Sequence, residues 1–260
     1  MPPTPPSTEW PIPKFLLRVD DLDHEGASLF FANVQPYDAL REAVLWTFTI
    51  LYTQETVPRK VKAIQLVLRN MPGVAHTFGT DTHKEIHFSL DWIKTNAHRA
   101  RDEIMGVLTH EVVHCFQHDA QGTCPGGLIE GVADFVRFHA ALSPPHWHHT
   151  APSHTDRWDA GYEKTAYFLD WLNIRYGPST TQTLNLAFRE RRYHRRIFRE
   201  ITGRPLRKLW ALYRASFSPN AQAGHAPDPP AESESEDEGY DRVSPIQAVL
   251  ATPNRSFDYR

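Results

Sequence analysis

Residues 102–118 read DEIMGVLTHEVVHCFQH. Apolar side chains recur at helical spacing in this segment, at Met105, Leu108, Val112, Cys115 and Phe116. The spacing predicts a helix with one face buried against the rest of the fold. His110 and His114 are four residues apart, so both imidazoles project from one side of that helix, with Glu111 beside them.

The pattern His-Glu-x-x-His contains the residue types that hold and use a zinc ion. Two neutral imidazoles can coordinate Zn²⁺, and an adjacent carboxylate can take a proton from water and pass it to a leaving amine. The chain has 15 histidines, so the alternative is two histidines and a glutamate on a solvated helix face. A third protein ligand decides between these two interpretations.

A third ligand follows in a second predicted helix, which starts after the loop-like Pro125-Gly126-Gly127. Glu130 and Asp134 are four residues apart and therefore share a face of this helix. Glu130 is the candidate third ligand, and Asp134 is the candidate carboxylate that accepts the free N–H of a ligating histidine. The spacing resembles that of thermolysin-like peptidases. A glycine three residues and a histidine six residues past His114 would mark another common arrangement, but those positions hold Gln117 and Ala120.

Four further motifs resemble the basic secretory protein family, which is grouped as zinc peptidases of plants, fungi and bacteria. They are GLIEGVADFVR at 127–137, PHW at 145–147, DRWDAGY at 156–162 and TAYFLDW at 165–171. The likeness covers roughly residues 20–215 and implies a zincin-like fold with one Zn²⁺ per chain. This chain is neither basic nor visibly secreted, so the family name predicts neither its charge nor its location.

The resemblance also implies where a substrate binds. Residues 74–78 would form a sheet edge over the cleft, where a peptide adds as an extra strand, so we expect Val74, Ala75 and His76 to contact it. The alternative is an ordinary edge strand with His76 facing solvent. Tyr162 is the candidate donor to the developing oxyanion opposite Glu111. A core tyrosine with a satisfied hydroxyl would give the same sequence.

The hydrophobic pattern changes once along the chain, near Thr95. Before it, alternating and short apolar runs predict strands at 15–19, 61–68, 74–78 and 85–90, with a helix at 37–52. After it, the pattern is helical almost throughout. The predicted fold class is α+β, a mixed N-terminal sheet with a helix, followed by a mostly helical half that carries the His-Glu-x-x-His helix.

Both ends of the chain have low-complexity composition. Residues 1–13 are proline-rich and predicted to be disordered, residues 14–218 form the predicted zincin-like peptidase domain, and residues 219–260 form a linker and tail. The acidic run 232–238 cannot bury enough apolar surface to order itself. The apolar segment 243–250 either docks back or stays loose. Whether the tail covers the cleft as a latency device is open.

Charge and composition exclude some functional classes. The net charge is −3, and Lys and Arg are scattered except in the run Arg189–Arg196, so we expect no nucleic-acid partner. That run is interpreted as one solvated helix face rather than a basic patch. No segment is long and apolar enough to span a bilayer, so we expect no membrane partner. The start, Met1–Pro6, lacks a charged region followed by an apolar run, which predicts a cytoplasmic protein.

Two other sets of residues leave alternatives open. Cys115 and Cys124 are either free thiols or one local bridge. The histidines between the second helix and Trp158 could form a different metal cluster, although loop histidines near proline are more often merely exposed; they are His146, His148, His149 and His154.

These patterns together favour a monomeric zinc-dependent peptidase that acts on a peptide or protein. His110, His114 and Glu130 would hold the metal, with Glu111 as general base and acid. One alternative is a non-catalytic, zinc-stabilised binding or defence-associated protein of the same fold. Another is a scaffold whose acidic tail recruits partners.

Overall fold

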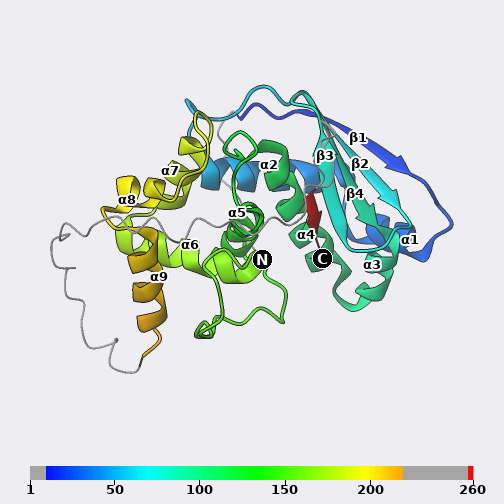
Figure 1. Cartoon of the computed structure of the whole chain (residues 1–260). Helices are drawn as coiled ribbons and strands as arrows, with labels where there is room; N and C mark the ends of the chain where they lie inside the picture. Colours follow the sequence, from blue (N-terminus) through cyan, green and yellow to red (C-terminus); the bar gives the residue numbers. More distant parts are fainter. Residues whose placement is uncertain (1–9, 219–256, 260) are drawn as a thin grey trace.

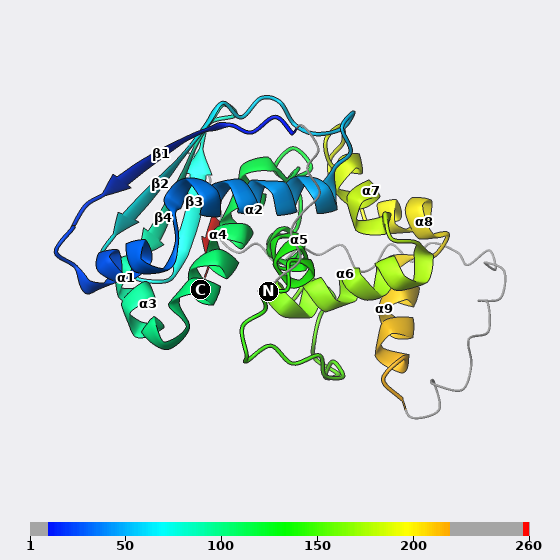
Figure 2. The same cartoon turned by 180° about the vertical axis from the view of Figure 1, so that it is seen from behind.

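The computed structural model describes residues 10–218 and 257–259. A mixed β-sheet lies at one end of the molecule and a group of helices at the other (Figures 1 and 2). This arrangement confirms the α+β prediction. Most of the predicted lead-in, the acidic run 232–238 and the apolar segment 243–250 lie outside the described residues, so the predicted domain limits stay predictions.

The sheet has the strand order β1-β2-β4-β3-β5. Strands β1, β2 and β4 are parallel, whereas β3 runs antiparallel to β4 and to β5. Their bounds are Lys14–Val19 (β1), Ala63–Arg69 (β2), Ala75–Gly79 (β3), His83–Ser89 (β4) and Phe257–Tyr259 (β5). The predicted alternation is only partial in β2: Ile64, Leu66 and Leu68 enter the core and Gln65 and Arg69 are partly exposed, but Ala63 and Val67 on the same face as Gln65 are also buried.

Two long helices, α2 (Pro36–Leu51) and α4 (Ala100–Phe116), pack against each other beside the sheet. Their contact includes the rings of Phe48 and Phe116, whose centroids are 4.6 Å apart. Helix α4 is buried on almost every side and not on one face only, because the sheet, α2 and the helical half all contact it. The segment that contains His110, Glu111 and His114 therefore lies inside the protein.

Two short helices were not predicted, α1 (Glu25–Asn33) and α3 (Leu90–Thr95). The side chain of His24 caps α1 by accepting from Gly26 N–H, and Ser89 caps α3 by accepting from Trp92 N–H. Both helices pack together at the end of the sheet that lies away from the helical half (Figure 1).

The helical half is built around α5 (Gly126–His139) and α6 (Tyr162–Tyr176), which pack against each other. Gly131 permits this approach, because a Cβ there would lie 2.2 Å from Cγ2 of Thr165. The remaining helices lie at the far end from the sheet (Figure 2); they are α7 (Thr180–Ala187), α8 (Arg196–Thr202) and α9 (Leu206–Ala215).

The interpretation of Arg189–Arg196 as a helix face is wrong. Residues 189–195 form the irregular connection between α7 and α8, and the helix begins only at Arg196. Arg189 pairs with Glu190 and Arg191 pairs with Glu200, so the local positive charge is partly neutralised at the surface.

Candidate metal centre

The two motif histidines meet at the buried inner side of α4. His110 and His114 are 0% and 5% exposed, and their Nε2 atoms are 3.1 Å apart. Both side chains come from consecutive turns of one helix, so the helix itself fixes their spacing. The solvated helix face that was the alternative interpretation is therefore excluded.

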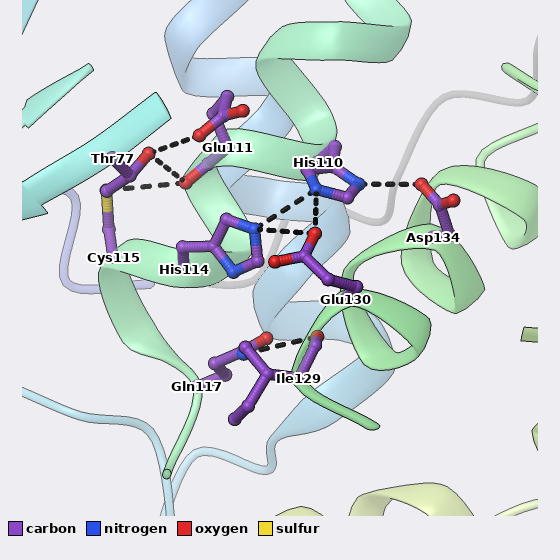
Figure 3. A network of polar contacts seen from close by, with 9 residues as sticks. All are labelled: Thr77, His110, Glu111, His114, Cys115, Gln117, Ile129, Glu130 and Asp134. Carbon is purple, nitrogen blue, oxygen red and sulfur yellow. Dashed lines mark hydrogen bonds and ion pairs between the residues drawn. The ribbon is translucent and has the colours of Figure 1, made fainter. Parts of the chain in front are cut away.

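Helix α5 supplies two carboxylates from consecutive turns. Glu130 Oε2 lies 3.1 Å from His110 Nε2 and 3.7 Å from His114 Nε2. Asp134 Oδ1 lies 2.6 Å from the other ring nitrogen of His110, Nδ1. In neutral His110, a proton on Nδ1 donated to Asp134 would leave Nε2 free to bind a metal ion; Figure 3 shows the contacts of both ring nitrogens.

These three side chains fit a zinc ion. Among the described residues, His110, His114 and Glu130 form the one group of metal-ligand types found, with ligand atoms within 4.8 Å of one another. Ligands about 2.0–2.1 Å from a tetrahedral zinc are about 3.3 Å apart, close to the separations between Nε2 and Oε2 atoms here. Two nitrogens and one carboxylate oxygen also match a catalytic site, which leaves a fourth position for water or substrate.

Carboxylates on both sides determine the charge of His110. Burial lowers the pKa of this imidazole, but Asp134 and Glu130 outweigh burial and raise the pKa to about 10. Burial also raises the pKa of Glu130, but His114 and His110 outweigh that effect and hold the pKa well below its usual range. These pKa directions favour a charged His110 between ionised carboxylates, so a metal ion that binds Nε2 would release a proton from His110.

Glu111 points away from the ligands toward the sheet. The hydroxyl of Thr77 on β3 lies 2.6 Å from Glu111 Oε2 and 3.0 Å from the Glu111 carbonyl oxygen, and donates to these acceptors (Figure 3). The other carboxylate oxygen, Oε1, is buried and has no hydrogen-bond partner among the described residues. Burial raises the pKa of Glu111 and outweighs the opposing effects of His114, His110 and Thr77.

Thr77 is a site residue that sequence reasoning missed. A single threonine in a strand forms no motif of fixed spacing that could mark it as functional. Only the packing of β3 on α4 brings it to Glu111. The one feature of the sequence that could have indicated Thr77 is its position in the predicted substrate-binding strand, residues 74–78.

Tyr162 lies beside the metal-ligand cluster. Its ring is nearly parallel to that of His110, with a centroid distance of 6.3 Å and an interplanar angle of 16°. The backbone is left-handed at both Gly161 and Tyr162, with φ of 94° and 49°. A positive φ is costly for a tyrosine, so the packing of the α6 start against α5 holds it in place.

The strand expected to bind substrate lies next to the same site. Val74 and Ala75 are buried, and His76 is half-buried against the rings of Phe78 and His87. Because successive side chains alternate, His76 and Phe78 lie on the face of β3 opposite Thr77. The side chain of His76 thus faces away from Glu111, while the backbone of β3 passes beside it.

The alternative histidine cluster does not form. His149 stacks on Tyr167 and contacts the Tyr213 hydroxyl, and His154 contacts Arg214. No metal-ligand group in the described part of the chain includes these loop histidines. Cys115 and Cys124 are both free thiols, which decides the other open alternative.

Comparisons with known proteins identify a family for the chain. The family described as "Peptidase of plants and bacteria" matches residues 12–213. A "Basic secretory protease" from Boswellia serrata is 34% identical over 68 residues, which is 26% of this chain and 78% of that relative. No solved structure matches the chain. In residues 10–218 and 257–259, no helix combines the length and apolar character that crossing a bilayer requires. The match over most of the chain confirms the resemblance found in its motifs, and the chain belongs to this family of peptidases of plants and bacteria.

Proposed function

We propose that this chain is a zinc-dependent peptidase of zincin-like fold, with one Zn²⁺ held by His110, His114 and Glu130. The observation that carries the proposal is the convergence of two imidazole nitrogens and one carboxylate oxygen, next in sequence to Glu111, whose buried Oε1 has no partner among the described residues. A structural ion pair would account for His110 and Glu130. It would not account for a second carboxylate with a buried oxygen that lacks a partner among the described residues.

Zinc bound there would act as a Lewis acid, polarising the peptide carbonyl and lowering the pKa of water. Glu111 accepts the proton of the attacking water and later gives it to the leaving amine. The Thr77 hydroxyl holds Oε2, so Oε1 is the oxygen that exchanges the proton. The Asp134 carboxylate keeps the proton of His110 on Nδ1.

Tyr162 is the proposed donor to the carbonyl oxygen as that oxygen becomes negative. A phenol hydroxyl placed beside the ligand cluster can stabilise that charge more than it stabilises the neutral ground state. The stacking of its ring alongside His110 supports the role, because it keeps the side chain next to the ligands.

The substrate is proposed to be a peptide bound as an extra strand along β3, through the backbone at Val74, Ala75 and His76. Main-chain hydrogen bonds would provide affinity independent of sequence, and pockets for alternate side chains would provide selectivity. The contact between Thr77 and Glu111 supports this position, because it brings β3 directly to the general base.

The test compares the wild-type protein with Glu111→Gln, both loaded with zinc and incubated with a diverse peptide mixture. Mass spectrometry identifies new termini, and metal analysis gives the zinc content. We expect cleavage only by the wild type, with about one zinc bound to both proteins. Zinc in both without cleavage would favour a zinc-stabilised binding protein, and absence of zinc would contradict both functions.

A further inference from the structure

A strand from the other end of the chain covers the outer edge of β3. Strand β5 pairs antiparallel with β3, with Ala75 opposite Tyr259, His76 opposite Asp258 and Thr77 opposite Phe257. It is the last strand in the order β1-β2-β4-β3-β5 and lies beside β3 and α4 (red in Figure 1). Without β5, one side of β3 would present unpaired backbone N–H and C=O groups.

The covered edge adjoins the proposed catalytic centre. Thr77, which is paired with Phe257, is the residue whose hydroxyl contacts Glu111. Ala75 and His76, which are paired with Tyr259 and Asp258, belong to the backbone proposed to bind substrate. A peptide added to β3 as an antiparallel strand would need the same N–H and C=O groups that β5 uses.

We propose that residues 257–259 occupy the substrate-binding edge of β3 in cis and compete with the peptide substrate. This inference rests on the proposed function for its kinetic consequence and on the strand pairing for its structural basis. Because β5 belongs to the same chain, its pairing with β3 is intramolecular and does not change on dilution. An exogenous peptide must displace β5 before it can bind.

Competition of this kind has a defined kinetic signature. Substrate binds only the fraction of molecules in which β5 has left β3, so the apparent KM rises by the reciprocal of that fraction. The value of kcat does not change, because β5 is already displaced in the enzyme–substrate complex. A strand needed only for folding would instead affect stability and kcat.

The test uses the full zinc-loaded chain with the double substitution Asp258→Pro and Tyr259→Pro. N–H groups of successive residues in a strand point to opposite sides, so one of two consecutive prolines removes an N–H that faces β3. The matched control, Asp258→Ala with Tyr259→Ala, removes the same side chains but keeps both amides.

Hydrogen exchange tests the pairing without reference to catalysis. Within the segment paired with β5, residues 75–77, the amides that face β5 should exchange at least about tenfold faster in the proline variant than in the alanine control, which should resemble the wild type. Equal protection of β3 in all three proteins would overturn the proposal.

Kinetics on a peptide that the wild type cleaves tests the competition. We expect the proline variant to have a KM about tenfold lower than the wild type, with kcat within about twofold. A synthetic peptide with the sequence of residues 254–260, NRSFDYR, should inhibit the proline variant competitively when added in trans. An unchanged KM, or a proline variant that loses zinc or thermal stability, would overturn the proposal.

The two proposals can fail separately. If no protein cleaves peptides although zinc is bound, the proposed peptidase function fails. Calorimetry then decides whether NRSFDYR binds the proline variant more tightly than the wild type. Tighter binding supports occupation of β3 by β5, and equal binding overturns it.

Discussion

At the scale of single residues, the two carboxylate oxygens of Glu111 have different surroundings. Oε2 accepts the hydrogen bond from Thr77, and Oε1 has no partner among the described residues. A carboxylate with one oxygen fixed has little rotational freedom, so under the proposed mechanism Oε1 is the oxygen left to exchange a proton. Thr77 therefore acts as a positioning residue through Glu111.

Removing the Thr77 hydroxyl should impair turnover more than metal binding. We expect Thr77→Val to lower kcat about 10- to 100-fold with zinc content unchanged, because valine keeps the shape and loses the donor. Thr77→Ser, which keeps the donor, should restore most of the activity. Thr109→Val is the matched control, since Thr109 is equally buried on α4 and its Oγ1 has no partner in the described structure. Equal loss in both valine variants would contradict the assignment.

The buried charge of Glu111 predicts a dependence of stability on pH. Burial raises its pKa above the unfolded value of 4.5, so the folded state favours the protonated carboxyl. This contribution to stability is fully present below pH 4.5 and is lost as pH rises through the folded pKa. The Glu111→Gln variant has no such charge, and its side-chain amide oxygen can still accept from Thr77.

In metal-free protein, the free energy of unfolding of Glu111→Gln should therefore exceed that of the wild type by a margin that grows from pH 4 to pH 7. Urea titrations at several pH values, with chelator present, measure this margin. Because His110 and His114 interact with Glu111, the margin reports the combined change in titration of these three groups. A margin that shrinks as pH rises would show that burial does not dominate at Glu111.

At the scale of secondary-structure elements, the site depends on how closely α5 approaches its neighbours. Gly131 meets Thr165 on α6, and a Cβ at Gly127 would lie 1.9 Å from the carbonyl oxygen of Asp159. These glycines let α5 settle between α4 and the start of α6. Glu130, Asp134 and Tyr162 thereby reach the same two histidines.

Gly131→Ala should destabilise the protein by about 1–3 kcal/mol, because the new methyl group overlaps Thr165 and must push α5 and α6 apart. Gly126→Ala, on the same helix, is the control, since a Cβ there meets nothing within 4 Å. We expect that variant to be neutral or slightly stabilised. Midpoints of chemical unfolding compare the two, and equal midpoints would show that the α5–α6 contact is not tightly packed.

Sequence predicted those elements that have a repeating pattern. The pairs His110–His114 and Glu130–Asp134 were found because four-residue spacing places side chains on one helix face. Helix α1 was missed because it is short and is capped by a histidine, which is not a preferred N-cap residue. The contact between Thr77 and Glu111, residues far apart in the chain, depends on tertiary packing that no local pattern contains.

At the scale of the whole molecule, α4 joins two halves that make different contributions to the site. The sheet half provides Thr77 and the strand β3, and the helical half provides Glu130, Asp134 and Tyr162. The histidines on α4 connect both halves. Zinc bound to α4 and α5 would therefore stabilise the junction between the halves rather than either half alone.

Removal of zinc should lower the thermal unfolding midpoint without unfolding the protein. Helix α4 is embedded in a large apolar core, and in metal-free protein the charged His110 pairs with Asp134 and Glu130, so the junction keeps its internal contacts. The free energy of unfolding should fall by the contribution of zinc binding, about 4 kcal/mol at a thousandfold excess of zinc over its Kd. Far-UV circular dichroism and thermal unfolding, with and without chelator, measure both quantities. Re-added zinc should restore the midpoint and Mg²⁺ should not, because Mg²⁺ prefers an octahedron of oxygen ligands over two imidazoles. A chelated protein without helical signal would mean that the core cannot hold α4 in place unless metal links it to α5.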